Sequence, residues 1–109
     1  MNLDKLLQGL EVKSTVGQLD RSVDSVVTDH RKIQTGSVWV CYRGVLIDAH
    51  QFMAQAIDKR PIAIIAENSR PIRIPTNIAY IQVGNSRSAL ARIPANCNGH
   101  PPEGIDIIG

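Results

Sequence analysis

The run Ile-Ala-Ile-Ile-Ala at residues 62–66, directly after Pro61, constrains the fold of this chain more than any other segment. It does not alternate between apolar and polar residues. A short continuous apolar run of this kind is typical of a strand that is buried on both faces. Such a strand needs helices on both sides of its sheet. The run therefore predicts an α/β domain with a small, open, largely parallel sheet flanked by helices.

Four further segments have the composition of strands. They are rich in β-branched or aliphatic residues, and glycine, proline or polar residues bound them. They lie at residues 26–28, 37–42, 78–83 and 105–108. Residues 11–24 are polar and include Gly17, and we expect them to form a strand or a loop over the sheet.

Two helices are predicted in the first 60 residues from apolar residues at helical spacing and from residues that can cap them. The first covers residues 3–10 and has Asn2 or Asp4 available as its cap. The second begins after Asp48, and Gln51 is placed to reach back and complete a capping box.

A third helix is predicted after Asn85 or Ser86. Its apolar face consists of Ala89, Leu90 and Ile93. Pro94 is expected to end or kink this helix, because an interior proline loses a backbone hydrogen bond and clashes, at about 3 kcal/mol.

Composition excludes several classes of protein. The 109 residues suffice for one compact domain. Twelve Lys and Arg residues against ten Asp and Glu give a net charge of +2, and the cations are scattered, which argues against a nucleic-acid-binding surface. Cys41 and Cys97 have no partners at zinc-ligand spacing and fit a reducing compartment. With neither a signal peptide nor an apolar run near the roughly 20 residues of a membrane span, we expect a cytoplasmic protein that binds no membrane.

The sequence also lacks the common catalytic and phosphate-binding motifs. Neither GxGxxG nor GxxxxGK[ST] occurs among its eight glycines, and HExxH and GxSxG are absent. The residues by themselves therefore favour a binding or docking domain. Ligands of open α/β sheets lie beyond the carboxyl ends of the strands. The candidate loops are residues 28–31, 42–48 and 84–87.

Each of these loops has a structural interpretation beside the functional one. Asp29 and Arg31 form either a local turn with a surface ion pair or part of a site. His30 is more often a solvated loop residue than a ligand contact, and Arg87 is either a phosphate contact or a solvated side chain. The three apolar residues at 45–47 need cover, from local packing, a neighbouring domain or a flat ligand ring.

Five motifs, in order along the chain, resemble the N-terminal domains of the Mur ligases. Residues 28–32 and 35–40 are similar to the family's DSRKxxxGDLFVA, residues 44–57 to GxxxDGHxFxxxAI, residues 62–67 to AVAVVxE, residues 85–90 to NSRxAL, and residues 99–101 to the end of YGHP. Each motif is weak alone. Together they cover nearly the whole chain.

The resemblance implies that residues 1–104 form the UDP-sugar-binding domain of a peptidoglycan-precursor ligase, and that residues 105–109 begin the strand leading to the family's central domain. Residues 3–12 and 99–101 most resemble the MurE type, which extends UDP-N-acetylmuramoyl-L-Ala-D-Glu by a third residue, a diamino acid. Two alternatives stay open. One is the MurF type, which adds D-Ala-D-Ala, and the other is a freestanding, non-catalytic interaction domain with the same fold.

A division of roles also follows from the resemblance. The family's N-terminal domain binds the UDP part of the nucleotide-sugar peptide, its central domain binds ATP and Mg²⁺, and its C-terminal domain binds the incoming amino acid. The chain's partners would then be UDP-N-acetylmuramoyl peptide and the enzyme's own other domains. We expect no catalytic or metal-binding residue and no cofactor within these 109 residues.

The positions of the implied uracil contacts follow from the matched motifs. They are Thr28, His30, Val45, Leu46 and Ile47. A uracil ring needs apolar cover on its faces and backbone hydrogen bonds at its edge, which such loops can provide. His30 stands where the family has a serine, and Arg31 is expected to hold the loop together.

Overall fold

A computed structural model describes residues 2–41, 52–68, 74–75 and 77–96. Of residues 94–96 it describes the backbone only. The strands are β1 Val12–Val16, β2 Ser25–Val27, β3 Ser37–Val40, β4 Ala63–Ala66 and β5 Ala79–Val83. The helices are α1 Leu3–Leu6, the 3₁₀ helix η1 His30–Lys32, α2 Met53–Asp58 and α3 Ser86–Asn96.

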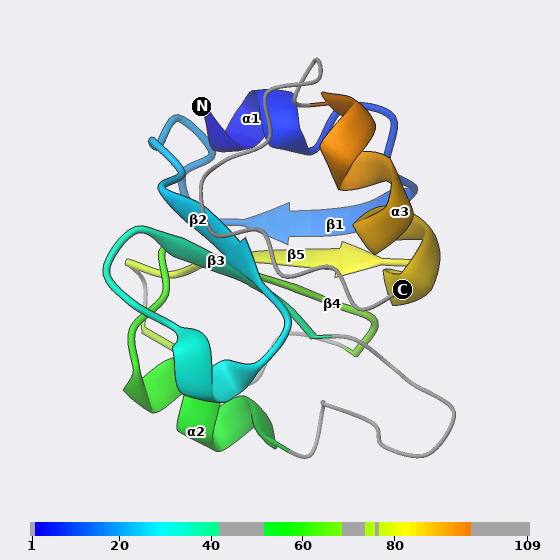
Figure 1. Cartoon of the computed structure of the whole chain (residues 1–109). Helices are drawn as coiled ribbons and strands as arrows, with labels where there is room; N and C mark the ends of the chain where they lie inside the picture. Colours follow the sequence, from blue (N-terminus) through cyan, green and yellow to red (C-terminus); the bar gives the residue numbers. More distant parts are fainter. Residues whose placement is uncertain (1, 42–51, 69–73, 76, 97–109) are drawn as a thin grey trace.

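The five strands form one sheet in the order β1-β5-β4-β3-β2 (Figure 1). Strands β2 to β5 are parallel, and β1 pairs antiparallel with β5 at the edge. The prediction of a largely parallel sheet flanked by helices is confirmed. The polar segment 11–24 contributes the antiparallel edge strand β1, most of whose residues are exposed. Strand β4 lies in the centre, and all four of its residues are buried, as the run 62–66 predicts.

Successive strand residues point to opposite faces of the sheet, which divides the core into two apolar clusters. The α1/α3 cluster lies on the face covered by helices α1 and α3 and contains Leu3, Leu6, Leu7, Val23, Val26, Val38, Val40, Ile62, Ala63, Ile65, Ala79, Ile81, Val83, Ala89, Leu90 and Ile93. The η1/α2 cluster lies on the other face, which helices η1 and α2 cover, and contains Val27, Ile33, Trp39, Cys41, Ala56, Ile64, Ala66, Ile74, Ile78 and Tyr80.

Two predicted helix caps are confirmed. The Asn2 side chain accepts a hydrogen bond from the Asp4 backbone N–H at 2.9 Å and so caps α1. The Asn85 side chain accepts from the Ser88 backbone N–H at 3.0 Å and caps α3. Each bond satisfies one of the backbone donors that a helix leaves free in its first turn.

Of the two outcomes predicted for Pro94, an end of α3 there is wrong, because the helix runs to Asn96, and a kink stays a prediction. Proline has a backbone angle that suits a helix, and what it lacks is the N–H that would bond to the carbonyl of Leu90. Only two helical residues follow Pro94, so little helix depends on the lost bond.

Several predictions fall outside the described residues. They are the Asp48–Gln51 capping box, the strand at residues 105–108 and the domain boundary between residues 104 and 105. Helix α2 itself begins at Met53, and its preceding residue, Phe52, makes no side-chain capping bond. In the described part of the chain, no helix is long and apolar enough to cross a membrane.

Candidate ligand site at the carboxyl edge of the sheet

The four parallel strands end at the same edge of the sheet, and their following residues form two structured corners there. One corner is the turn from β2 into η1, built on residues 28–32. The other joins the end of β4, at Glu67, to the start of α3, at Ser86. Because ligands of open α/β sheets bind beyond this edge, these two corners are the candidate site within the described residues.

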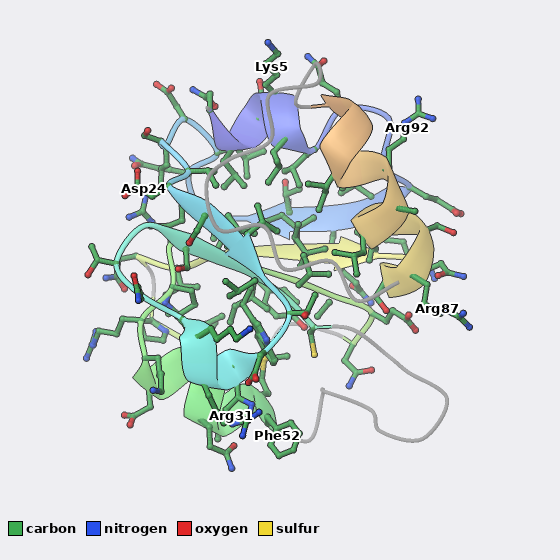
Figure 2. The ribbon with its side chains drawn as sticks, viewed as in Figure 1. Lys5, Asp24, Arg31, Phe52, Arg87 and Arg92 are labelled. Carbon is green, nitrogen blue, oxygen red and sulfur yellow. The ribbon has the colours of Figure 1, made fainter. Side chains whose placement is uncertain are left out.

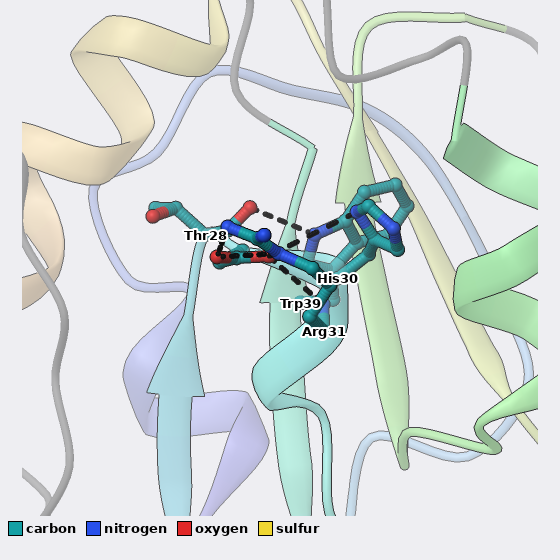
Figure 3. A network of polar contacts seen from close by, with 5 residues as sticks. Thr28, His30, Arg31 and Trp39 are labelled. Carbon is teal, nitrogen blue, oxygen red and sulfur yellow. Dashed lines mark hydrogen bonds and ion pairs between the residues drawn. The ribbon is translucent and has the colours of Figure 1, made fainter.

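The β2–η1 corner is closed by Asp29 and Arg31. One Asp29 carboxylate oxygen accepts from the Arg31 backbone N–H at 2.9 Å and so caps η1. The Arg31 guanidinium donates to the same carboxylate from Nε, at 3.0 Å, and from Nη2, at 2.8 Å (Figure 3). These bonds, chiefly the side-chain bond from Arg31, lower the pKa of Asp29 to about 2. The structural interpretation of Arg31, as the residue that holds this loop together, is confirmed.

The same corner is tied to the neighbouring strand through Trp39. The indole Nε1–H of Trp39 donates to the backbone carbonyl of Thr28 at 3.0 Å (Figure 3). Both residues are buried, so this bond satisfies two polar groups that would otherwise be costly to bury. The turn that carries Thr28 is therefore fixed to β3.

His30 is not the solvated loop residue that its sequence position favours. Its ring stacks on that of Phe52, with ring centroids 4.4 Å apart and planes inclined by 16°. The His30 side chain is only 18% exposed, and its Nδ1 lies 3.9 Å from the nearer Asp29 carboxylate oxygen. The reason is tertiary: η1 and the start of α2 lie on the same face of the sheet and contact each other. His30 is thus held in position by the fold.

The second corner is organised by Glu67. Its Oε2 accepts from both the backbone N–H and the hydroxyl of Ser86, each at 2.8 Å. A carboxylate at this place stabilises the positive end of the α3 dipole. The chain's own carboxylate therefore holds the first turn of α3. Arg87 is exposed and points away from the sheet (Figure 2), as expected of a solvated side chain.

The structure brings together only part of the predicted uracil site. Thr28 and His30 share the β2–η1 corner. The predicted contacts Val45, Leu46 and Ile47 lie outside the described residues. Among the described residues, no group of three or more His, Cys, Asp or Glu side chains could hold a metal ion.

Comparison with known proteins shows which family this chain resembles. No family model matches the chain. A UDP-N-acetylmuramoyl-L-alanyl-D-glutamate–2,6-diaminopimelate ligase of Bacillus licheniformis is 34% identical over 110 residues, covering 100% of this chain and 22% of the ligase. The ligase of the same name from Clostridioides difficile is 29% identical, with the same shares of both chains. The chain corresponds to the N-terminal domain of the Mur ligases.

Solved structures agree with this assignment. MurF from Acinetobacter baumannii superposes on 90% of this Mur ligase domain with a TM-score of 0.69 and 25% sequence identity. The match covers 21% of the MurF chain. The domain therefore spans about a fifth of the length of the relatives that it matches.

Sequence reasoning missed three features of this Mur ligase domain. They are the Trp39–Thr28 bond, the His30–Phe52 stack and the pair of hydrogen bonds from Ser86 to Glu67, called here the Glu67–Ser86 clamp. The clamp left a signal, since Glu67 directly follows a buried strand, where a carboxylate needs a partner. The Trp39–Thr28 bond and the His30–Phe52 stack depend on which strands and helices become neighbours, and no short sequence pattern predicts those neighbours.

Proposed function

We propose that this Mur ligase domain docks the UDP part of UDP-N-acetylmuramoyl-L-Ala-D-Glu for a ligase that adds the third peptide residue, a diamino acid, at the expense of ATP. One observation carries the proposal. The chain aligns over its full length with ligases whose names specify that substrate and 2,6-diaminopimelate, at 29% and 34% identity.

The β2–η1 corner supports a docking role because its own hydrogen bonds hold the turn without a ligand. Trp39 donates to the carbonyl of Thr28 and so holds it in place. The paired bonds from the Arg31 guanidinium to the Asp29 carboxylate, called here the Asp29–Arg31 fork, hold the first turn of η1. A preorganised turn loses little conformational entropy on binding. The His30–Phe52 pair adds an aromatic surface beside it. We assign Thr28 and His30 to one side of the uracil ring and Val45, Leu46 and Ile47 to its apolar cover.

The phosphate-transfer chemistry belongs, in this proposal, to the rest of the ligase. This sequence contains no GxxxxGK[ST] loop. ATP and Mg²⁺ would be held by the central domain, which activates the substrate carboxylate, and the C-terminal domain would supply the amine. The residues of this chain bind and orient the nucleotide end of the substrate. We place the whole enzyme in the cytoplasm, where its partners are the nucleotide-sugar peptide and its own two other domains.

A MurF-type ligase, which adds D-Ala-D-Ala, is the second candidate. The structural likeness to MurF from Acinetobacter baumannii favours it. The two candidates differ in the length of the accepted peptide and in the added amine, while the UDP end is common to both. An assay of ATP-dependent phosphate release by the whole ligase separates them. The third-residue proposal expects release with the UDP-linked dipeptide plus a diamino acid, and the MurF proposal expects it with the UDP-linked tripeptide plus D-Ala-D-Ala.

The docking role is tested by titrating the ¹⁵N-labelled chain with UDP-N-acetylmuramoyl-L-Ala-D-Glu and following its amide shifts, with ATP as the control ligand. We expect saturable shifts at residues 28–31 and 45–48 and no saturation with ATP. His30→Ala and Leu46→Asp should each weaken binding about tenfold, the effect of losing one good contact. Lys13→Ala, on the exposed edge strand, should leave it unchanged. The absence of shifts at millimolar ligand would favour the freestanding interaction domain.

A further inference from the structure

The amino ends of the parallel strands border a polar cavity that is separate from the candidate ligand site at their carboxyl ends. It lies where β1 ends and β5 begins, at the left ends of these strands in Figure 1. Its volume is about 430 Å³, and its lining residues are Gly17, Gln18, Arg21 and Asn77. Since Thr28 and His30 follow the carboxyl end of β2, this cavity and the β2–η1 corner are at opposite ends of the sheet.

Arg21 is the fixed element of this cavity. Its Nη1 donates to the backbone carbonyl of Ile62 at 3.1 Å and also to that of Asn77. The Ile62 carbonyl directly precedes β4, and the Asn77 carbonyl lies two residues before β5, so both acceptors are backbone groups close to the sheet. The Arg21 residue is half-buried, and the two bonds from Nη1 orient its guanidinium. Little side-chain entropy is left for a ligand to remove.

Within the described residues, Arg21 has no counter-charge. Both ion pairs found there belong to Asp29, and the neighbouring Asp20 carboxylate accepts instead from the Asn2 side chain at 2.8 Å. Both acceptors of Arg21 are neutral carbonyls, and both bond to a single nitrogen. The side of the guanidinium that carries Nε and Nη2 has no acceptor among these residues. That side presents two parallel N–H groups, which fit the two oxygens of a carboxylate.

The walls of the cavity add donors. Gln18 and Asn77 are exposed, and no described residue bonds to their side-chain amides. Gly17 lets β1 end close to β5: its φ is +96°, and a Cβ there would lie 3.0 Å from the Cα of Ala79. The cavity is therefore open, polar and supplied with donors around one oriented positive charge.

We propose that this cavity is a carboxylate-binding site, in which Nε and Nη2 of Arg21 bind the two carboxylate oxygens and the amides of Gln18 and Asn77 contact the group that carries them. Two sources share this chemistry. One is a small carboxylic acid, and the other is an acidic side chain of a polypeptide.

The test is an NMR titration of the ¹⁵N-labelled chain at constant ionic strength. The probes are sodium acetate, a blocked Gly-Glu-Gly peptide, the matching Gly-Gln-Gly peptide, inorganic phosphate and sodium chloride. We expect saturable shifts, at residues 17, 18, 21 and 77 and at the Arg21 Nε–H, with acetate and the Glu peptide only. At least tenfold tighter binding of the Glu peptide than of acetate identifies a polypeptide source, and a smaller difference identifies a small acid.

Variants separate binding from the role of Arg21 in holding the strands. Arg21→Gln should weaken carboxylate binding at least about tenfold, the value of a charged bidentate contact. Arg92→Gln removes the same charge from the exposed side of α3 and should change nothing (Figure 2). Asn77→Ala keeps the backbone carbonyl that anchors Arg21, so it should keep the fold and still reduce affinity for the Glu peptide.

Three results would overturn the proposal. One is equal shifts with chloride or the Gln peptide, and another is tighter binding of phosphate than of carboxylate. The third is undiminished binding by a folded Arg21→Gln variant.

Discussion

The two faces of the sheet are built from different kinds of side chain. The α1/α3 cluster consists entirely of Leu, Val, Ile and Ala. The η1/α2 cluster also contains Trp39, Tyr80 and Cys41, which combine an apolar body with a polar tip. In both clusters these residues are buried, so both contribute hydrophobic stabilisation.

The polar tips give the η1/α2 cluster a second role. The Trp39 indole bonds to the carbonyl of Thr28, and the Tyr80 hydroxyl donates to the carbonyl of Asn68 at 2.7 Å. Burial raises the pKa of Tyr80 from 10.0 to about 12, so its hydroxyl stays a proton donor even in moderately alkaline solution. Both bonds hold loops at the carboxyl edge. The α1/α3 cluster thus stabilises the domain, whereas the η1/α2 cluster also shapes its candidate site.

The largest expected effect comes from a charge placed in β4. Ile64 and Ile65 are fully buried and belong to the η1/α2 and α1/α3 clusters, respectively. Ile64→Asp and Ile65→Asp should both unfold the chain, because a buried unpaired carboxylate costs several kcal/mol and small domains have only about 5–15 kcal/mol of stability. Ile→Val at either position should cost only about 0.5–1.5 kcal/mol. Circular dichroism melts check both. A folded Asp variant would mean that its face of β4 is open to water.

The next largest effect, from Trp39→Phe, separates the stabilising role of the core from the role of the η1/α2 cluster in shaping the candidate site. Trp39→Phe should lower the free energy of unfolding by about 1–3 kcal/mol, because it leaves the Thr28 carbonyl without its donor and opens space in the core. It should also shift the amide resonances of residues 28–32. Val38→Ala, one position away in the α1/α3 cluster, should cost a similar amount without those shifts. Urea melts and amide spectra of the two variants measure this. Equal amide shifts at residues 28–32 in both variants would contradict the proposed difference between the two faces of the sheet.

A smaller effect is expected at the second corner. Ser86→Ala removes the hydroxyl bond to Glu67 and keeps the backbone bond, so it should cost about 0.5–1.5 kcal/mol. Ser88→Ala is the matched control, because only the backbone of Ser88 takes part in the cap. Denaturant melts should show a loss for the first variant alone. A loss of equal size in both would place the stabilisation in the helix backbone and not in the clamp.

The smallest effect is the pH dependence of the Asp29–Arg31 fork. The pKa of Asp29 lies at about 2 in the folded chain and at 3.8 ordinarily, so its contribution is complete above pH 3.8 and is lost as the pH falls toward 2. The contribution is small because the Arg31 side chain is 77% exposed. Asp29→Asn should therefore remove a minor part of the acid sensitivity in thermal melts. Arg31→Gln should do the same, and an unchanged acid profile in both would contradict the role of the fork.

The sequence by itself determined the local elements of this protein. The apolar run at residues 62–66 predicted the central buried strand, and Asn2 and Asn85 predicted two helix starts. Both kinds of prediction succeed because hydrophobic patterns and helix caps involve residues only a few positions apart. The motifs at residues 28–32 and 85–90 indicated the Mur ligase family. Pro94 was predicted less well, because a lost hydrogen bond matters little when only two helical residues follow it.

Tertiary structure decided which of these elements meet. It paired the polar segment of β1 with β5, stacked His30 on Phe52, and joined Glu67 to Ser86. It also brought Arg21 to two carbonyls more than 40 residues away along the chain. These contacts depend on the order of strands in the sheet and on the face that each helix covers, and neither is encoded in any short segment. For that reason, the positions of the candidate loops followed from the sequence, whereas their geometry came only from the fold.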